Sequence, residues 1–111
     1  MNKLSDRQKH LVENTKEASI TVDVGCDHGI IGTTLLKENK TKFLIATDIS
    51  APSAKKAKIL LEKCGLASRA SVRIGDGLKT IKDDEIPDQI LIAGMGGKEI
   101  CHILENYKKI C

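Results

Sequence analysis

Four short runs of β-branched and aliphatic residues, each followed at once by glycine or aspartate, most constrain how this chain of 111 residues can fold. The runs occupy residues 20–24, 43–47, 70–74 and 89–93. Apolar runs of this length are typical of strands that are buried on both faces of a parallel sheet. They alternate with stretches of helical patterning, which indicates an α/β sheet that is covered on both faces.

The predicted helices begin and end at recognisable signals. Ser5 and Gln8 form a capping-box pattern for a first helix. Pro52 suits the first turn of another helix, which ends at Gly65. Two further helices are expected, one over about 30–38 and a last one through Ile100, Ile103 and Leu104. The sequence therefore predicts a Rossmann-like α/β fold with a mostly parallel sheet of about four strands and flanking helices.

Length and composition favour a single domain, residues 1–111. Its core must be aliphatic, because Phe43 and Tyr107 are the only aromatic residues, and this nearly excludes base stacking on aromatic platforms. The net charge of +3 is compatible with an anionic partner but does not identify one.

The four cysteines form no CxxC pair and the three histidines are scattered, so we expect reduced thiols and no metal site. The polar N-terminus and the lack of a long apolar run predict no signal peptide and no membrane span, and hence a cytoplasmic protein.

Each of the four runs ends in residues that are suited to bind a ligand. In open parallel sheets the ligand binds outside the carboxyl ends of the strands. Asp48 is placed to accept hydrogen bonds from both hydroxyls of a ribose, and Asp76 is placed to accept one from the exocyclic amine of an adenine. The strand ends are Gly25-Cys26-Asp27-His28-Gly29, Asp48, Gly75-Asp76-Gly77 and Gly94-Met95-Gly96-Gly97.

Purely structural alternatives remain open for each of these strand ends. The glycines can simply permit tight turns. Asp48 can cap the helix that starts near Pro52, and Asp76 can be an ordinary turn aspartate. His28 can cap the second helix without any chemical role.

Asp27 bears most directly on the choice of ligand. A dinucleotide-binding turn has the pattern G-x-G-x-x-G, and here Asp27 replaces the second glycine. A carboxylate at that position repels a pyrophosphate and favours a cationic ligand. S-adenosylmethionine carries an ammonium and a sulfonium but no phosphate, and a buried Asp23 would pair with the ammonium. The acidic strand ends therefore favour S-adenosylmethionine over NAD, while a nicotinamide-dependent oxidoreductase remains an alternative.

Several stretches resemble the bacterial TrmK family, the tRNA (adenine(22)-N(1))-methyltransferases. They are LSDR near the start, VDVGCDHG, the IGDGL of residues 74–78, and IAGMGGKEI at 92–100. The resemblance spans essentially the whole chain. It implies a class I methyltransferase of Rossmann-like fold that uses S-adenosylmethionine to methylate adenine N1 in tRNA.

The resemblance also implies roles for individual residues. Asp27 and His28 match the family's DH pair and are the candidate catalytic residues. In this interpretation Asp27 stabilises the positive charge that the methylated adenine gains, and His28 orients Asp27 or contacts the base. The implied cofactor-binding residues are Asp23, Gly25, Cys26, Asp48, Ile49, Asp76, Gly77, Ala93, Gly94 and Met95.

Contacts with tRNA are expected from basic residues. Arg7 matches an arginine in the family's first helix. Lys55 and Lys56 belong to a group of lysines on the third predicted helix, although most of these lysines are expected to form a solvated face. A homodimer is conceivable through an uncovered edge of the sheet.

The chain departs from the family pattern in two ways. The family usually continues the DH pair as AYLP, whereas this chain has Gly29-Ile30-Ile31-Gly32, which removes a tyrosine from the pocket wall. Family members are also longer, with further strands and a C-terminal coiled-coil arm. The chain is therefore expected to be a partial methyltransferase domain, and a fragment that binds the cofactor without catalysing methyl transfer remains an alternative.

Overall fold

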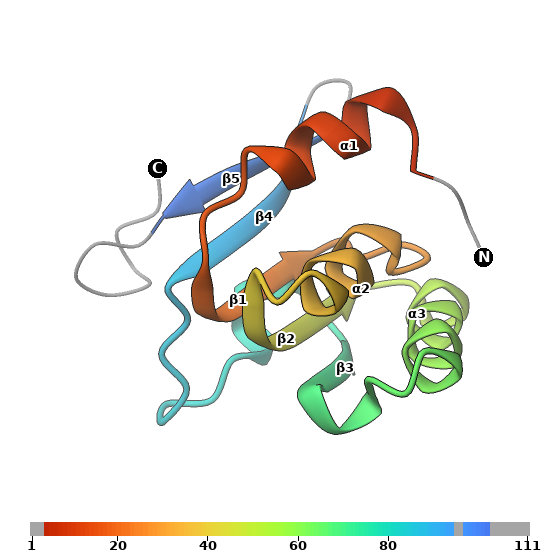
Figure 1. Ribbon diagram of the computed structural model, residues 1–111. Coiled ribbons are helices and arrows are strands. Elements are labelled where there is room, and N and C mark those ends of the chain that lie inside the picture. The colour runs from red at the N-terminus through yellow and green to blue at the C-terminus, as the bar shows by residue number, and fades with distance from the viewer. Residues whose placement is uncertain (1–3, 95–96, 103–111) are drawn as a thin grey trace.

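The computed structural model describes residues 4–94 and 97–102 (Figure 1). The elements are, in order, α1 (Asp6–Glu13), β1 (Ala18–Val24), α2 (Ile30–Lys37), β2 (Thr41–Asp48), α3 (Ala51–Lys63), the 3₁₀ turn η1 (Ala67–Arg69), β3 (Ala70–Ile74), the 3₁₀ turn η2 (Gly77–Thr80), β4 (Gln89–Gly94) and β5 (Gly97–His102). Strand β3 coincides with the predicted run 70–74, and β1, β2 and β4 extend slightly beyond theirs.

The described strands form one sheet in the order β3-β2-β1-β4-β5. Strand β1 pairs in parallel with β2 and with β4, and β3 pairs in parallel with β2. The chain runs outward from β1 to β3 and then crosses back to β4, so the strand order reverses between β1 and β4. In open α/β sheets this reversal marks the ligand-binding edge. The predicted α/β fold with four parallel strands is confirmed.

The prediction of a helix after the fourth strand is wrong for residues 97–102. These residues form β5, which pairs antiparallel with β4, and Gly94 stands opposite Gly97 in the register. Only two residues separate this glycine pair, which is the connection length of a tight hairpin rather than of a crossover to a helix. The predicted helical positions Ile103 and Leu104 lie outside the described residues.

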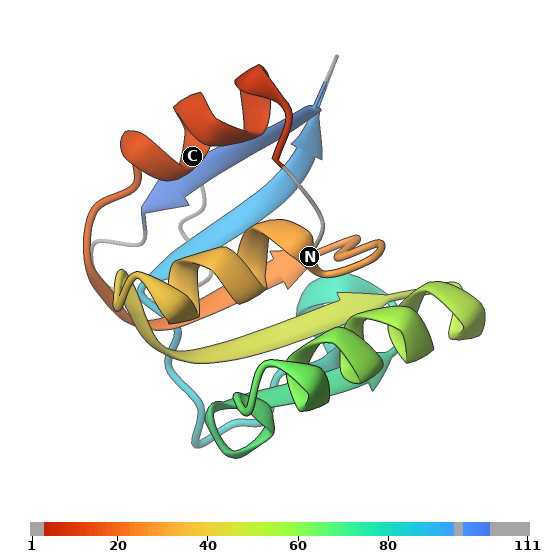
Figure 2. The same ribbon diagram turned by 45° about the vertical axis from the view of Figure 1, so that its right-hand side comes forward.

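The helices cover one face of the sheet. Figure 2 shows α1, α2 and α3 side by side on that face. Beneath them, Leu36, Leu44 and Leu61 belong to one buried cluster, and Leu35 and Leu91 belong to another. These five side chains are at most 1% exposed, so this face supplies much of the hydrophobic stabilisation.

Among the described residues, the opposite face is covered by η2 and the segment that follows it, and not by a helix. Val22, Ile45 and Ile90 are fully buried on this face, and Leu78 and Ile81 pack against them. The expectation of a sheet covered on both faces therefore holds only with this thinner layer. The connection from β3 to β4 is a 3₁₀ turn and a loop, which is why no helix crosses this face.

The layer is held in place by an ion pair between Arg73 on β3 and Glu85 in the loop before β4. The two guanidinium nitrogens donate to the two carboxylate oxygens at 2.7 and 2.6 Å. Arg73 also donates to the carbonyl of Thr80 at 2.8 Å, and Glu85 accepts from the amide of Lys82 at 2.8 Å. The hydrogen bonds that Glu85 accepts from Arg73 and from the Lys82 amide outweigh the effect of burial, and they lower the pKa of Glu85 from 4.5 to about 2.

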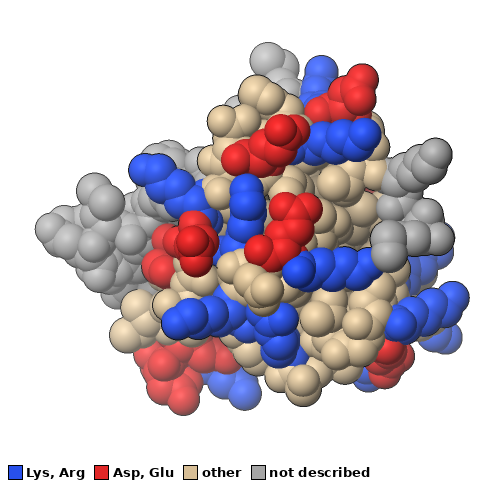
Figure 3. Space-filling model, in the orientation of Figure 1, with Lys and Arg blue, Asp and Glu red and all other residues tan. Residues whose placement is uncertain are grey.

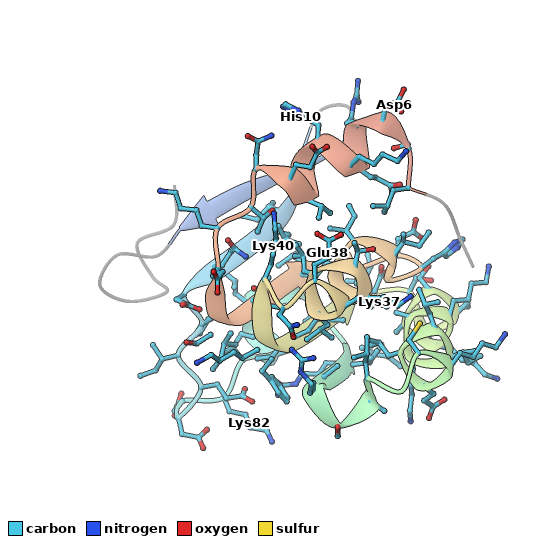
Figure 4. The ribbon with its side chains drawn as sticks, viewed as in Figure 1. Asp6, His10, Lys37, Glu38, Lys40 and Lys82 are labelled. Carbon is cyan, nitrogen blue, oxygen red and sulfur yellow. The ribbon has the colours of Figure 1, made fainter. Side chains whose placement is uncertain are left out.

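Helix α1 begins and ends at polar contacts. The predicted capping box is present, because the Gln8 amide donates to Ser5 Oγ at 3.1 Å and the Ser5 amide donates to Gln8 Oε1 at 2.9 Å. At the other end, Lys40 Nζ donates to the carbonyl of Val12 at 2.6 Å. Figure 4 shows Lys40 between α1 and α2. A lysine at a helix C-terminus satisfies carbonyls that lack an intrahelical partner, so Lys40 ties α1 to the body of the domain.

Gly29 lies where the start of α2 comes close to α3. It has φ +77°, and a Cβ added to it would lie 2.8 Å from the Cβ of Ala57 on α3. Gly65 has a similar φ of +71° but nothing within 4 Å of its added Cβ, so it serves as the matched control. We expect Gly65→Ala to lower the free energy of unfolding by about 1 kcal/mol and Gly29→Ala by at least about 2 kcal/mol, because only the latter adds overpacking to backbone strain. Urea denaturation measures both values, and equal losses would contradict the close approach.

The Arg73–Glu85 pair makes stability depend on acid pH in a defined direction. A carboxylate whose pKa is lowered on folding stabilises the folded state above its ordinary pKa, and it loses that contribution as the pH falls through its folded pKa. At pH 7 we expect Glu85→Gln to lower the free energy of unfolding by about 1–3 kcal/mol. The difference from the unmodified protein should shrink as the pH falls from about 4.5 to about 2. Thermal unfolding across this range checks the trend, with the exposed Asp84→Asn as control, and a difference that is constant with pH would refute it.

Candidate functional site at the carboxyl edge of the sheet

The loops that follow β1, β2 and β3 meet at one edge of the sheet. Val24 pairs in register with Thr47, and Asp48 pairs with Ile74. The strand-end residues singled out in the sequence therefore lie beside one another. This edge is also where the strand order reverses.

Asp48 joins these loops to one another. Its Oδ2 accepts a hydrogen bond from the amide of Asp27 at 2.9 Å, and its Oδ1 accepts one from the amide of Ser50 at 2.8 Å. Its backbone carbonyl accepts a third from the amide of Gly75 at 2.9 Å. Each carboxylate oxygen can accept more than one hydrogen bond, and Asp48 is partly exposed, so it retains the capacity to accept from a ligand diol.

The alternative that Asp48 is the N-cap of α3 is wrong. The N-cap of α3 is Ser50, whose hydroxyl accepts from the amide of Ser53 at 3.3 Å. Asp48 instead receives the amide of the cap residue itself. The alternative that His28 caps α2 is also wrong, because the N-cap of α2 is Gly29.

The turn between β1 and α2 has three residues in the left-handed region. Gly25, Asp27 and Gly29 have φ values of 71°, 53° and 77°. Asp27 is thus a non-glycine residue in a conformation that favours glycine, although aspartate tolerates it better than most residues do. Cys26 is 4% exposed, and its amide donates to the carbonyl of Thr47 at 2.8 Å. A hydrogen bond at the buried Cys26 therefore holds the turn against β2.

Asp27 and His28 point outward from this turn. Asp27 Oδ1 lies 3.6 Å from His28 Nε2, and the two side chains are 74% and 48% exposed. The sequence analysis predicted that Asp27 and His28 act as a pair. In the structure the two side chains lie close together and exposed, at the edge where the strand order reverses. A carboxylate beside an imidazole in such a position can stabilise positive charge that develops on a ligand.

Asp76 and Gly77 form the wall of the site after β3. Asp76 is 75% exposed, and its carboxylate lies 3.6 Å from Nζ of Lys79. Gly77 is buried, with φ +43°, and a Cβ on it would lie 3.0 Å from Cγ1 of Val24. The absence of a side chain at Gly77 lets this loop lie against the end of β1.

Asp23 lies deeper than the other acidic residues. It is 1% exposed, and on β1 it pairs in register with Ala46 and Leu91. Its carboxylate therefore sits within the carboxyl end of the sheet and not on its surface.

An apolar surface borders the carboxylates. Ile49, predicted from the resemblance, is 80% exposed and follows Asp48 directly. Ile74 is 64% exposed and pairs in register with Asp48. Sequence reasoning missed Ile74, although its place as the last residue of a strand run, directly before Gly75, was a usable signal. Two exposed isoleucines beside a carboxylate suit a ligand that has an apolar face and a polar edge.

The remaining predicted residues fall at other places. Ala93 and Gly94 lie in the last part of β4, whose preceding residue Ile92 pairs with Val24, whereas Met95 lies outside the described residues. The predicted RNA-binding residues are on separate helices, Arg7 on α1 and the neighbours Lys55 and Lys56 on α3, and all of them are exposed.

Two kinds of feature are not found in the described part of the chain. No group of three or more His, Cys, Asp or Glu side chains there is arranged to hold a metal ion. None of the described helices has the length and apolar character that a membrane crossing requires.

Comparison with known proteins identifies the family of the chain. A family model described as a methyltransferase domain matches residues 4–111. The chain belongs to this methyltransferase family. It is 42% identical over 106 residues to the tRNA (adenine(22)-N(1))-methyltransferase of Bacillus subtilis, which is 96% of this chain and 44% of that protein. The chain thus spans less than half the length of the curated relatives that it matches.

Solved structures of the same group share the fold. The crystal structure of the B. subtilis m1A22 tRNA methyltransferase TrmK superimposes with a TM-score of 0.74 at 39% identity, covering 85% of this chain and 40% of that one. The structure of M. capricolum TrmK in complex with S-adenosyl-homocysteine superimposes with a TM-score of 0.70 at 28% identity, covering 76% and 37%. The TrmK resemblance and the Rossmann-like fold class are therefore confirmed.

The role of Asp48 as the link between the loops can be tested directly. In Asp48→Asn one carboxylate oxygen becomes an amide nitrogen, which cannot accept from a backbone amide. We expect a loss of about 1–3 kcal/mol in the free energy of unfolding, with faster hydrogen exchange at the amides of Asp27 and Ser50. NMR-detected exchange measures this, with Asp83→Asn as a control at an exposed site. Unchanged protection at both amides in Asp48→Asn would show that the carboxylate does not hold these loops.

Proposed function

We propose that this chain is the cofactor-binding part of an enzyme that transfers a methyl group from S-adenosylmethionine to N1 of adenine 22 in tRNA. The observation that carries the proposal is the set of carboxylates at one sheet edge, in a chain that is similar to the B. subtilis enzyme over nearly its whole length. The donor set fits the cofactor, because Asp48 retains acceptor capacity for a ribose and the edge offers acidic groups to a cationic ligand.

Different residues of this sheet edge would contact different parts of the cofactor. Asp48 would accept from the ribose hydroxyls, and Asp76 from the exocyclic amine of the adenine. Ile49 would cover a face of the adenine ring with its exposed side chain. The methionine part would lie against the β1 turn and the end of β4, at Gly25, Cys26, Gly77, Ala93, Gly94 and Met95, with the buried Asp23 directly beneath.

Asp27 and His28 would face the target base. S-adenosylmethionine supplies a methyl group on a sulfonium, which is displaced in line by the adenine N1 lone pair, so the sulfur leaves as a neutral thioether and the adenine gains the positive charge. The reaction requires no proton transfer, so the protein mainly aligns the reactants and stabilises the charge. The exposed carboxylate of Asp27 supplies the stabilising charge, and His28 holds it in place or contacts the base. The target adenine must first leave its stack in the folded tRNA.

The tRNA would be held by basic residues, among them Arg7, Lys55 and Lys56. Figure 3 shows Lys and Arg side chains at the right of the view, where α3 lies, and acidic and basic side chains are intermingled over the rest of this face and below them. Contacts of this kind bind the phosphate backbone without reading sequence, and they weaken as salt is raised.

The setting proposed for this activity is the cytoplasm. Self-association into a homodimer is proposed through an uncovered edge of the sheet, since β3 and β5 each have a strand neighbour on one side only in the described sheet. The alternative of a fragment that binds the cofactor without catalysis rests on the share of the relatives that the chain spans. The nicotinamide alternative draws no support from the methyltransferase family to which the chain belongs.

The decisive experiment incubates the chain with radiolabelled S-adenosylmethionine and unmodified tRNA, in parallel with a transcript in which A22 is replaced by G. We expect label only in the A22 transcript. Asp27→Asn should lower turnover by at least about tenfold, while Asp83→Asn should leave it unchanged. If the chain binds the cofactor but labels no tRNA, the fragment alternative is favoured. If it binds NAD more tightly than S-adenosylmethionine, the oxidoreductase alternative is favoured. If Asp27→Asn keeps full turnover, Asp27 has no catalytic role.

A further inference from the structure

The side chains of β3 alternate between the two faces of the sheet. Ala70 and Val72 pack against the buried cluster beneath the helices. Because successive side chains of a strand point to opposite faces, Ser71 and Arg73 lie on the face that η2 covers. Strand β3 therefore places an arginine on the same face as η2, the 3₁₀ turn that has Asp76 as its N-cap.

The guanidinium of Arg73 holds the far end of η2. Its Nη1 donates to the carbonyl of Thr80, the last residue of this turn, at 2.8 Å. The Thr80 hydroxyl donates to the carbonyl of Gly77, the first residue of the turn, at 2.8 Å. The Lys79 amide donates to the carbonyl of Asp76 at 2.9 Å. Hydrogen bonds across one 3₁₀ turn therefore connect Arg73 to the residues that form the wall of the candidate site.

Glu85 keeps Arg73 in the orientation that this contact needs. The carboxylate accepts from Nη1 and Nη2 of Arg73 at 2.7 and 2.6 Å, and the two side chains are only 21% and 15% exposed. Nε of Arg73 donates to the hydroxyl of Ser71 at 3.1 Å, so all three guanidinium nitrogens are engaged. A lysine has a single nitrogen and no planar fork, and it cannot make these contacts together.

Asp76 depends on its backbone for its position. Its side chain is 75% exposed and lies 3.6 Å from Nζ of Lys79, whose side chain is 84% exposed. A contact between exposed charges of this kind constrains a side chain only weakly. The direction of the Asp76 carboxylate is therefore set mainly by the turn that follows it, and the end of this turn is bound to Arg73.

We propose that Arg73, held by Glu85, is a positioning residue that keeps the carboxylate of Asp76 directed at the exocyclic amine of the adenine, so that the recognition of adenine in this site depends on it. Arg73 acts through η2 and does not contact the ligand. This inference rests on the proposed function, which takes Asp76 as the acceptor for that amine. It adds that the base selectivity of the site originates in the layer opposite the helices.

The test compares S-adenosylhomocysteine with S-inosylhomocysteine, in which a carbonyl oxygen replaces the exocyclic amine of the purine. Calorimetry measures the dissociation constant of each compound. The constant of the inosine compound divided by that of the adenosine compound reports how strongly the site recognises the amine. A smaller folded fraction weakens both ligands equally, so this ratio does not respond to a loss of stability alone. Circular dichroism verifies folding.

The test variant and its control each change an arginine to lysine at one end of β3. Arg73→Lys keeps the charge and loses the planar fork. The matched control is Arg69→Lys, directly before β3 and at the end of the strand away from the site. The Arg69 guanidinium also donates to backbone carbonyls, but to those of Leu36, Thr41 and Lys42 and not to η2.

We expect the unmodified chain to bind the adenosine compound more tightly than the inosine compound. Asp76→Asn should lower the ratio by about tenfold, because the asparagine amide can donate to the inosine oxygen. Arg73→Lys should lower it by at least about threefold, since the carboxylate remains but loses its direction. Arg69→Lys should leave it unchanged. If Arg73→Lys does not fold, Glu85→Gln, which releases Arg73 without removing it, takes its place with the same expected fall.

Three results would overturn the inference, and they differ in what they leave standing. If Asp76→Asn shifts the ratio but Arg73→Lys shifts it no more than Arg69→Lys does, the inference fails and the proposed role of Asp76 stands. If Asp76→Asn leaves the ratio unchanged, Asp76 does not recognise the amine, and the inference fails together with that role. If neither compound binds, the proposed function is overturned, and the inference that rests on it is overturned as well.

Discussion

At the carboxyl edge of the sheet, one aspartate holds three loops that are far apart in the sequence. The carboxylate of Asp48 receives the amides of Asp27 and Ser50, and its carbonyl receives the amide of Gly75. Hydrogen bonds to a charged acceptor are stronger than those between neutral groups. Asp48 can therefore fix the relative positions of the loops that follow β1, β2 and β3. The proposed ligand would meet a site that is largely formed before it binds.

The β1 turn stores strain at the place where chemistry is proposed. A non-glycine residue in the left-handed region is uncommon, and such residues cluster at functional sites. Asp27 adopts this conformation while its amide is held by the carboxylate of Asp48. The same constraint directs the Asp27 side chain outward, where it lies beside His28. Backbone geometry, and not packing of the side chain, thus positions the candidate catalytic pair.

Much of the fold could be predicted because its signals are local. The capping box at Ser5 and the apolar run of β3 are both found where the sequence indicated. The site could be predicted as a set of strand ends, because parallel strands bring their carboxyl ends to one edge. What could not be predicted depends on contacts distant in sequence. The bond from Asp27 to Asp48 spans 21 positions, and the run through Ile100 has spacings that a helix and a strand share until β4 provides a partner.

The two faces of the sheet differ in how firmly they are closed. One is closed by helices that pack on buried leucines, and the other by the segment from η2 to β4, which Arg73 fastens through Glu85. The helix-covered face rests on apolar burial, whereas the other face depends in part on one pair of charged side chains. Dissolved salt screens charge pairs but does not remove the attraction between apolar groups. The closure of the face that continues into Asp76 and Gly77 is therefore the more sensitive of the two to ionic strength.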